Sequence, residues 1–167
     1  TLEKYEPSGD YVVVKFARWA FEKFPQATDI LGTQMKAVGE VMSIGKTYKE
    51  ALQKAIRSLE SGRYGIGFAK DFNTLTLEEL RKRLAFPSSE RIFLMYEALR
   101  KGMPIKELWN MTKINQWFIE QMKELVMLEE EILKAEKRVD DDGFVLLRFD
   151  RLHQFCDLFV IAQEIHQ

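Results

Sequence analysis

The chain has 167 residues, enough for one domain or one domain with part of another, and 46% of them are hydrophobic, so it can bury a core. A formal net charge of −1 gives no long-range attraction for nucleic acid or an anionic membrane, which argues against both as partners. A single cysteine excludes an intrachain disulfide and fits a cytoplasmic protein, and no apolar run approaches the roughly 20 residues of a membrane-spanning helix.

Signals for β-structure are concentrated near the N-terminus. The β-branched run "YVVVKF" begins at Tyr11, directly after the turn-forming "PSGD". Residues 21–34 predict an irregular or short helical connection. Because one strand cannot form a sheet alone, we expect this strand to be disordered or paired non-natively.

From residue 46 onwards the pattern predicts helices. Thr47 with Glu50, and Thr76 with Glu79, are capping boxes that precede apolar positions at helical spacing. The apolar face of the first helix consists of Ala51, Leu52, Ala55, Ile56 and Leu59. Further helices are expected from Ser88 or Ser89 to Gly102, from Pro104 through Trp109, from about Asn115 to Val139, and at about 151–165. The predicted fold class is all-α, an irregular multihelical domain with one short N-terminal β-strand left from a neighbouring domain.

Residues 39–47, "GEVMSIGKT", are close to the phosphate-binding pattern G-x-x-x-x-G-K-[ST]. The end of the pattern fits, but five residues separate Gly39 from Gly45, and Glu40 stands where glycine is required. The residue count sets the geometry of such a loop, and a carboxylate at its mouth would repel phosphate. The preceding "TQMKA" is polar, whereas a phosphate-binding loop follows a buried strand. We interpret the match as accidental and keep a P-loop enzyme as an alternative.

Other candidate chemical sites have simpler structural explanations. His153 and Cys156 could bind a metal or form part of a Cys/His nucleophile, but a structural zinc site needs about four such ligands, and a buried helical cysteine is favoured. "DDDG" at 140–143 lacks the alternating ligands of a calcium loop and is interpreted as a solvated turn, and "GRYGIGF" at 62–68 as a helix stop with a connector. Residues 129–131, all Glu, are interpreted as a solvent-exposed face. Without an acid–base pair, activated nucleophile or metal set, we predict no catalytic, cofactor-binding or metal-binding residue, and a binding or scaffolding role.

The long helix that begins near Asn115 carries methionine and aromatic side chains along one side. Such side chains are more often core than a cofactor-binding surface, but one stripe left for another subunit is the open alternative. The candidate association surface consists of Trp117, Phe118, Met122, Leu125 and Val126.

Residues 7–60 resemble the large chain of carbamoyl phosphate synthetase, at the point where its first ATP-grasp unit runs into the oligomerisation domain. The resemblance lies in "PSGDYVVVKFARWAFEKF", in "TQMKAVGEVMSIGKT" and in the helix opening "EALQKA". Residues 91–132 resemble later helices of the same domain, including "WFIEQMKELV" at 117–126. Residues 139–167 show no family pattern.

The resemblance implies two parts. Residues 1–45 would be the C-terminal end of the carboxyphosphate (ATP-grasp) unit with its junction, and residues 46–167 the helical oligomerisation or connection domain. The parent enzyme would make carbamoyl phosphate from bicarbonate, glutamine-derived ammonia and two molecules of ATP, for arginine and pyrimidine biosynthesis. It would need ATP with magnesium or manganese, at residues upstream of Thr1, so this fragment alone is expected to be inactive and to hold no cofactor.

The partners that the resemblance implies are other large subunits, in a homo-oligomer, and the small glutaminase subunit through the parent chain. The alternative is a stand-alone helical protein–protein interaction module. Its support is the unmatched segment at 139–167 and the absence of the upstream synthetic unit from this sequence.

Overall fold

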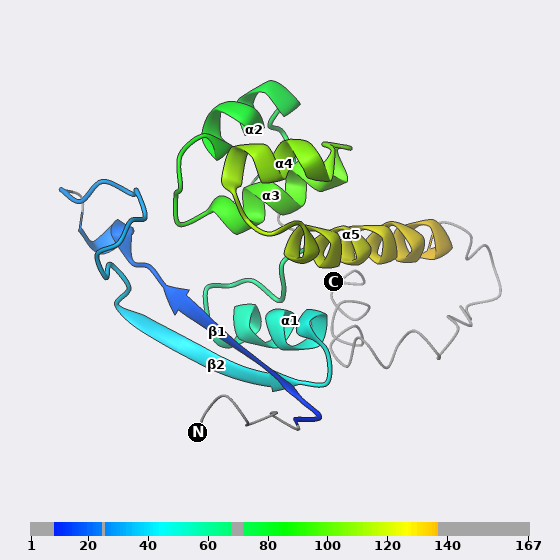
Figure 1. The fold of residues 1–167 in the computed structure, drawn as a ribbon, viewed down its shortest axis with the longest axis horizontal. Coiled ribbons are helices and arrows are strands. Elements are labelled where there is room, and N and C mark those ends of the chain that lie inside the picture. The colour runs from blue at the N-terminus through cyan, green and yellow to red at the C-terminus, as the bar shows by residue number, and fades with distance from the viewer. Residues whose placement is uncertain (1–8, 25, 68–71, 137–167) are drawn as a thin grey trace, which may run out of the picture.

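The computed structural model describes residues 9–24, 26–67 and 72–136, and these form two layers (Figure 1). The elements are β1 (Val12–Arg18), the 3-10 helix η2 (Phe21–Lys23), β2 (Gly39–Gly45), α1 (Tyr48–Ser58), α2 (Leu77–Leu84), α3 (Arg91–Arg100), α4 (Ile105–Thr112) and α5 (Gln116–Glu136). The two strands form one layer, α2 to α5 form the other, and α1 lies between the sheet and α5. The described part is therefore predominantly helical, as predicted, with a small sheet.

The sheet pairs β1 with β2 in antiparallel orientation, from Val12 opposite Gly45 to Arg18 opposite Gly39. The sequence predicted only the first of these strands, because residues 39–45 were interpreted as a junction. The expectation that the first strand is disordered or paired non-natively is wrong, since its partner lies in the same chain. Burial alternates along β2, but its buried positions are Ser43 and Gly45 whereas the apolar Met42 and Ile44 are exposed, so the apolar pattern of the sequence does not predict this strand.

Helix α1 packs on one face of the sheet. Thr47 begins the helix as predicted, since its hydroxyl accepts a hydrogen bond from the backbone N–H of Glu50 at 3.2 Å. The approach to β2 is close, because a Cβ atom at Gly45 would meet the backbone N of Ala51 at 2.8 Å. The Ser43 hydroxyl donates to the carbonyl of Ala51 at 2.5 Å. All of the predicted apolar positions in this helix are buried, namely Ala51, Leu52, Ala55, Ile56 and Leu59.

The hydrophobic core joins the two layers. Its fully buried large side chains come from α1 to α5 and the connection before α2, and comprise Leu52, Ile56, Ile66, Leu80, Leu84, Leu94, Met95, Leu108 and Ile119. The predicted stop of α3 is confirmed at Gly102, which has a positive φ of 87° that glycine adopts without strain. Tertiary packing of these apolar faces, more than helix propensity, stabilises helices as short as α2 and α4.

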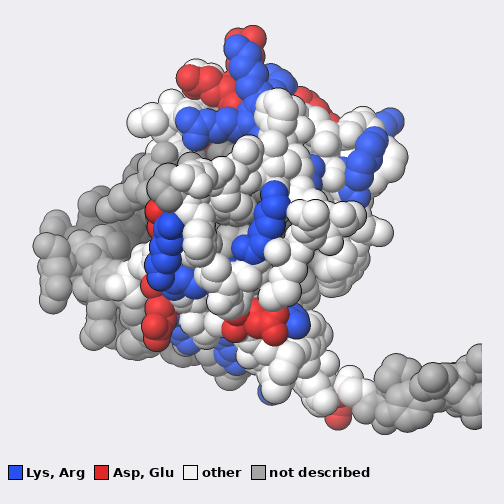
Figure 2. Space-filling view, turned by 90° about the vertical axis from the view of Figure 1, so that its left-hand side faces the viewer, with Lys and Arg blue, Asp and Glu red and all other residues white. Residues whose placement is uncertain are grey.

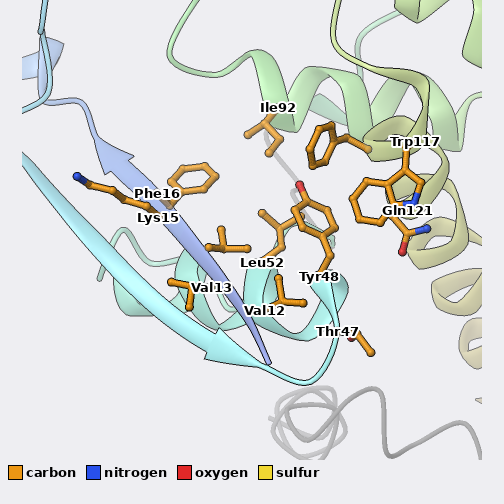
Figure 3. A pocket seen from close by; sticks show the side chains of 12 residues that line it. Val12, Val13, Lys15, Phe16, Thr47, Tyr48, Leu52, Ile92, Trp117 and Gln121 are labelled. Carbon is orange, nitrogen blue, oxygen red and sulfur yellow. The ribbon is translucent and has the colours of Figure 1, made fainter. Parts of the chain in front are cut away.

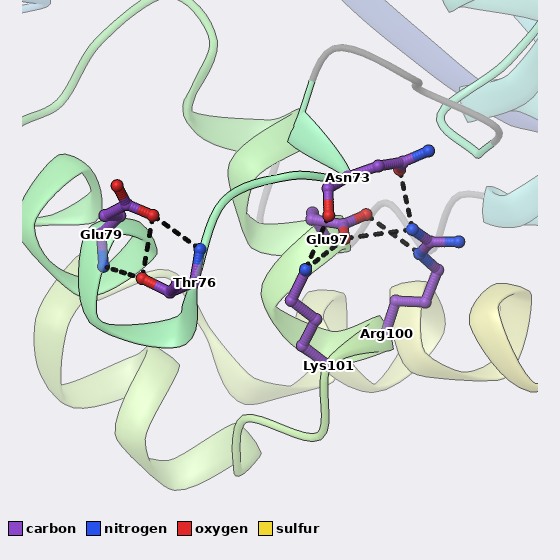
Figure 4. Close-up of polar contacts among 6 residues, drawn as sticks. All are labelled: Asn73, Thr76, Glu79, Glu97, Arg100 and Lys101. Atoms are coloured by element: carbon purple, nitrogen blue, oxygen red, sulfur yellow. Dashed lines mark hydrogen bonds and ion pairs between the residues drawn. The ribbon is translucent and has the colours of Figure 1, made fainter.

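Polar side chains fix the start of α2 and the connection that leads into it (Figure 4). The Thr76 hydroxyl accepts from the backbone N–H of Glu79 at 3.3 Å, and the Glu79 carboxylate accepts from the backbone N–H of Thr76 at 2.7 Å. The predicted capping box is thus confirmed. On α3, the buried Glu97 carboxylate contacts Arg100 at 2.9 Å and Lys101 at 3.5 Å.

A second buried carboxylate connects α3 with α5. The Tyr96 hydroxyl donates to Glu129 Oε2 at 2.5 Å, and both residues are at most 5% exposed. Gly67 leaves room for this pair, since a Cβ atom there would meet Glu129 Oε2 at 2.7 Å. The interpretation of residues 129–131 as a solvent-exposed face is therefore wrong for Glu129, because its side chain is buried and accepts a hydrogen bond from Tyr96 of α3.

The extended segment before β2 is attached to the helical layer. The Asp29 carboxylate accepts hydrogen bonds from the backbone N–H of Ser89 at 2.8 Å and from its hydroxyl at 2.6 Å. The N–H of Leu31 donates to the carbonyl of Pro87 at 2.7 Å. These contacts join the connection between the strands to the connection between α2 and α3.

Several predictions lie outside the described residues. These are the helix at 151–165, the acidic turn at 140–143, and the pair His153 and Cys156.

Candidate functional site

A groove with a volume of about 650 Å³ lies where β1 meets α1, α3 and α5 (Figure 3). Its walls are Val12, Val13, Val14, Lys15 and Phe16 of β1, Thr47, Tyr48 and Leu52 at the start of α1, Ile92 of α3, and Trp117, Phe118 and Gln121 of α5. Most of these side chains are apolar. The volume is within the range of about 300–1,000 Å³ that binding pockets commonly have.

Three aromatic rings form one wall of this groove. The centroid of Tyr48 lies 5.3 Å from those of both Trp117 and Phe118, and these two rings lie 5.0 Å apart. The arrangements are tilted or edge-to-face, which aromatic pairs prefer. Burial raises the pKa of Tyr48, so its phenol stays protonated and can donate a hydrogen bond. The wall therefore offers a rigid apolar surface with one hydroxyl.

The aromatic wall is positioned by the start of α5. The Asn115 side chain accepts a hydrogen bond from the backbone N–H of Trp117 at 2.9 Å, and its carbonyl accepts from Phe118 at 3.1 Å. An ion pair of 2.5 Å between Lys49 and Glu124 ties α1 to α5. These contacts hold the rings of the two helices against each other.

The structure divides the predicted association stripe. Trp117 and Phe118 are 49% and 40% exposed and line the groove, whereas Met122, Leu125 and Val126 are at most 4% exposed and belong to the core. The division follows from the width of the buried face of α5, which packs against α3, α4 and α1 and takes up the middle of the stripe. Only the first two residues can therefore present a surface in this fold, and their role in association stays a prediction.

Tyr48 is a member of the groove that the sequence pattern did not indicate. It follows the predicted helix start and was not part of the apolar face of that helix. Its contact with Trp117 and Phe118 depends on how α1 and α5 cross. No feature of the sequence pattern predicts this contact between the three rings.

Residues 39–47 do not form a phosphate-binding loop in the structure. Residues 39–45 are strand β2, so their N–H groups do not converge on one point. The Glu50 carboxylate accepts the hydrogen bond of the Lys46 backbone N–H at 2.8 Å, and the Thr47 hydroxyl caps α1. A carboxylate of the chain itself thus occupies this helix start.

Charged side chains of both signs are scattered over the face that Figure 2 shows, and they are most numerous at the top, where α2 lies. Among the described residues, no group of three His, Cys, Asp or Glu side chains could hold a metal ion. No helix in the same part of the chain combines the length and the apolar character needed to cross a bilayer.

Comparison with known proteins identifies the family of this chain. Residues 40–158 match the family model described as carbamoyl-phosphate synthetase large chain, oligomerisation domain. The chain belongs to this family. The match begins six residues before the predicted domain boundary at 46. It extends over most of 139–167, where the sequence alone had shown no family pattern.

Long relatives support the assignment. The carbamoyl phosphate synthase large chain of Archaeoglobus fulgidus is 51% identical over 139 residues, which are 83% of this chain and 13% of the relative. The large chain, N-terminal section, of Methanopyrus kandleri is 48% identical over 137 residues, 81% of this chain and 24% of the relative. The large chain of Synechocystis sp. is 47% identical over 129 residues, 77% of this chain and 12% of the relative. This chain thus spans less than a quarter of the length of each.

Proposed function

We propose that this chain is the non-catalytic oligomerisation or connection section of a glutamine-dependent carbamoyl phosphate synthetase large subunit. The observation that carries the proposal is the family match over residues 40–158. The parent enzyme would make carbamoyl phosphate from bicarbonate, glutamine-derived ammonia and ATP with magnesium or manganese. Its pathways, cytoplasmic location and small glutaminase subunit are part of the same proposal.

Within the parent, the section would bring large chains together. The groove wall of Trp117 and Phe118 is the surface that we assign to this contact. Half-exposed aromatic side chains held by neighbouring rings lose little conformational entropy on binding, and aromatic residues are enriched at the centres of interfaces. The exposed fractions of 49% and 40% leave substantial apolar area to be removed from water.

Sedimentation velocity over a broad concentration range tests this role. We expect reversible self-association that Trp117→Ser weakens at least about tenfold, the effect of losing one aromatic anchor. Trp109→Ser is the matched control, because Trp109 is also partly exposed, at 36%, and lies outside the groove. A monomer at every concentration, or equal effects of both substitutions, would refute the proposed surface.

A nucleotide-binding measurement tests the non-catalytic part of the proposal. Titration calorimetry with MgATP is expected to give no heat of binding, and Lys46→Ala is expected to change nothing. Magnesium-dependent binding that is lost in Lys46→Ala would support the P-loop alternative instead. The stand-alone interaction module would gain support if this chain captured an unrelated protein but never a second copy of itself.

A further inference from the structure

Trp117 and Phe118 are neighbours in the sequence, yet their rings meet. Adjacent residues of an α-helix point about 100° apart, so their side chains normally do not face each other. Here the ring centroids lie only 5.0 Å apart and the ring planes are inclined at 82°. The geometry of α5 alone does not account for this contact, so a side chain from another element must contribute to it.

Tyr48 of α1 supplies the third ring of the contact. Its centroid lies 5.3 Å from the centroid of each of the other two rings, so the three form a nearly equilateral triangle (Figure 3). Tyr48 is partly buried and packs against the hydrophobic core, whereas Trp117 and Phe118 are 49% and 40% exposed. Tyr48 therefore connects the two exposed rings to the core.

The position of Tyr48 is itself fixed. Tyr48 is the first residue of α1 and directly follows Thr47, whose hydroxyl caps the helix. The next residue, Lys49, pairs with Glu124 of α5 at 2.5 Å, and its side chain is only 12% exposed. Glu124 lies about two helical turns beyond Trp117, so the ring contact and the ion pair hold α1 against α5 at two separate points.

We propose that Tyr48 is a positioning residue for self-association, because its ring holds Trp117 and Phe118 in the orientation in which they meet a second copy of the chain. The inference deepens the proposed function and rests on it. An exposed aromatic side chain without a neighbour exchanges between staggered χ1 rotamers, and each side chain that must be immobilised on binding weakens the complex. Tyr48 restricts these rotamers before association, so it strengthens the complex without having to contact the partner.

Sedimentation velocity with two substitutions of Tyr48 tests the inference. Tyr48→Leu keeps an apolar side chain at this helix position but removes the ring, and we expect it to raise the dissociation constant of self-association at least about fivefold. Tyr48→Phe keeps the ring and should associate like the wild type. Tyr11→Leu is the matched control, because Tyr11 is 62% exposed and lies outside the groove. Thr76→Ala controls for a loss of stability that does not involve the groove, and both controls should leave the dissociation constant unchanged.

The motion of the Trp117 ring gives a readout that does not require association. The chain has three tryptophans, so the double substitution Trp19→Phe and Trp109→Phe leaves Trp117 as the only indole. Time-resolved fluorescence anisotropy is measured at a concentration at which the chain is monomeric. In this background, Tyr48→Leu is expected to increase the component of anisotropy decay that reports ring motion on the nanosecond scale, and Tyr48→Phe is expected to leave it unchanged.

The outcomes separate this inference from the proposed function. Association that Trp117→Ser weakens and Tyr48→Leu does not would overturn the inference alone. Weakening by Tyr48→Phe as strong as that by Tyr48→Leu would also overturn it, because the hydroxyl rather than the ring would then matter. Unchanged motion of Trp117 in Tyr48→Leu would do the same, since the orientation of the indole would not depend on Tyr48. A wild type that stays monomeric at every concentration would instead overturn the proposed surface and, with it, any role of Tyr48 in association.

Discussion

The hydrogen bond between Tyr96 and Glu129 provides the most direct test of how the helical layer is held together. Tyr96→Phe removes only the hydroxyl that donates to Glu129 Oε2 at 2.5 Å. The two residues are 4% and 5% exposed, so water does not readily replace the lost donor. A hydrogen bond to a charged group contributes about 1.5–3 kcal/mol, so we expect the free energy of unfolding to fall by about 2 kcal/mol.

Urea denaturation followed by circular dichroism at the helical band measures this difference. For a chain of this size, about 2 kcal/mol corresponds to a melting temperature lower by about 4–8 °C. Tyr11→Phe is the matched control, because it deletes the same hydroxyl from a side chain that is 62% exposed, and it should change stability by less than about 0.5 kcal/mol. A loss below about 0.5 kcal/mol in Tyr96→Phe would refute the reasoning.

A double-mutant cycle identifies the origin of the loss. Glu129→Gln keeps an acceptor but removes the charge, so Tyr96→Phe should cost only about 1 kcal/mol in that background.

Burial, and next the charge of Glu129, raise the pKa of Tyr96 well above its ordinary value of 10.0. The stabilisation is therefore complete below pH 10.0 and decreases as the pH rises above it, so alkaline solutions should destabilise the wild type more than Tyr96→Phe.

Three further substitutions test local features, each by urea denaturation. Thr76→Ala removes the cap of α2 and should cost about 1 kcal/mol, whereas Thr74→Ala, at an exposed position in the preceding connection, should have almost no effect. Gly45→Ala should lower the free energy of unfolding by about 1–3 kcal/mol, because its Cβ would lie 2.8 Å from the backbone of α1. Gly39→Ala, at the other end of β2, should be neutral because its Cβ would meet nothing within 4 Å. Equal effects of both substitutions would contradict the close approach. Hydrogen bonds from Lys54 and the Lys46 backbone lower the pKa of Glu50 from its ordinary value of 4.5. Ionised Glu50 therefore stabilises the fold above pH 4.5, and this contribution is lost as the pH falls below that value. Glu50→Gln should flatten the loss of stability in acid, and an unchanged slope would contradict this prediction.

Helices were predictable because their signals are local. Helix ends depend on residues only a few positions apart, as at the caps Thr47 and Thr76 and at the stop Gly102. The apolar spacing of the first helix then gave its buried face in full. No distant part of the chain was needed for these predictions.

Other features depended on contacts between distant elements. Strand β2 was not predicted because its buried positions are Ser43 and Gly45 while Met42 and Ile44 are exposed, which is the reverse of the usual apolar alternation of a strand. On α5, apolar spacing could not separate core from surface, so Met122 and Trp117 were placed in one stripe although only the first is buried. Glu129 was assigned to the surface because its partner, Tyr96, lies on another helix. Pairings of this kind are set by tertiary geometry and leave no short-range trace.

The hydrogen bonds between Asp29 and Ser89 affect where a folding unit that contains this section should begin. The family match starts at residue 40, yet Asp29 and Leu31 hold the turn that leads into α3, deep within the matched region. A protein trimmed to the limits of the family match would keep α1 to α5 but would lose β1, η2 and these three hydrogen bonds. The family match begins inside β2 and leaves out both its partner strand and the segment that contacts Ser89. Truncations designed for crystallography or for transplanting the section should therefore begin before β1.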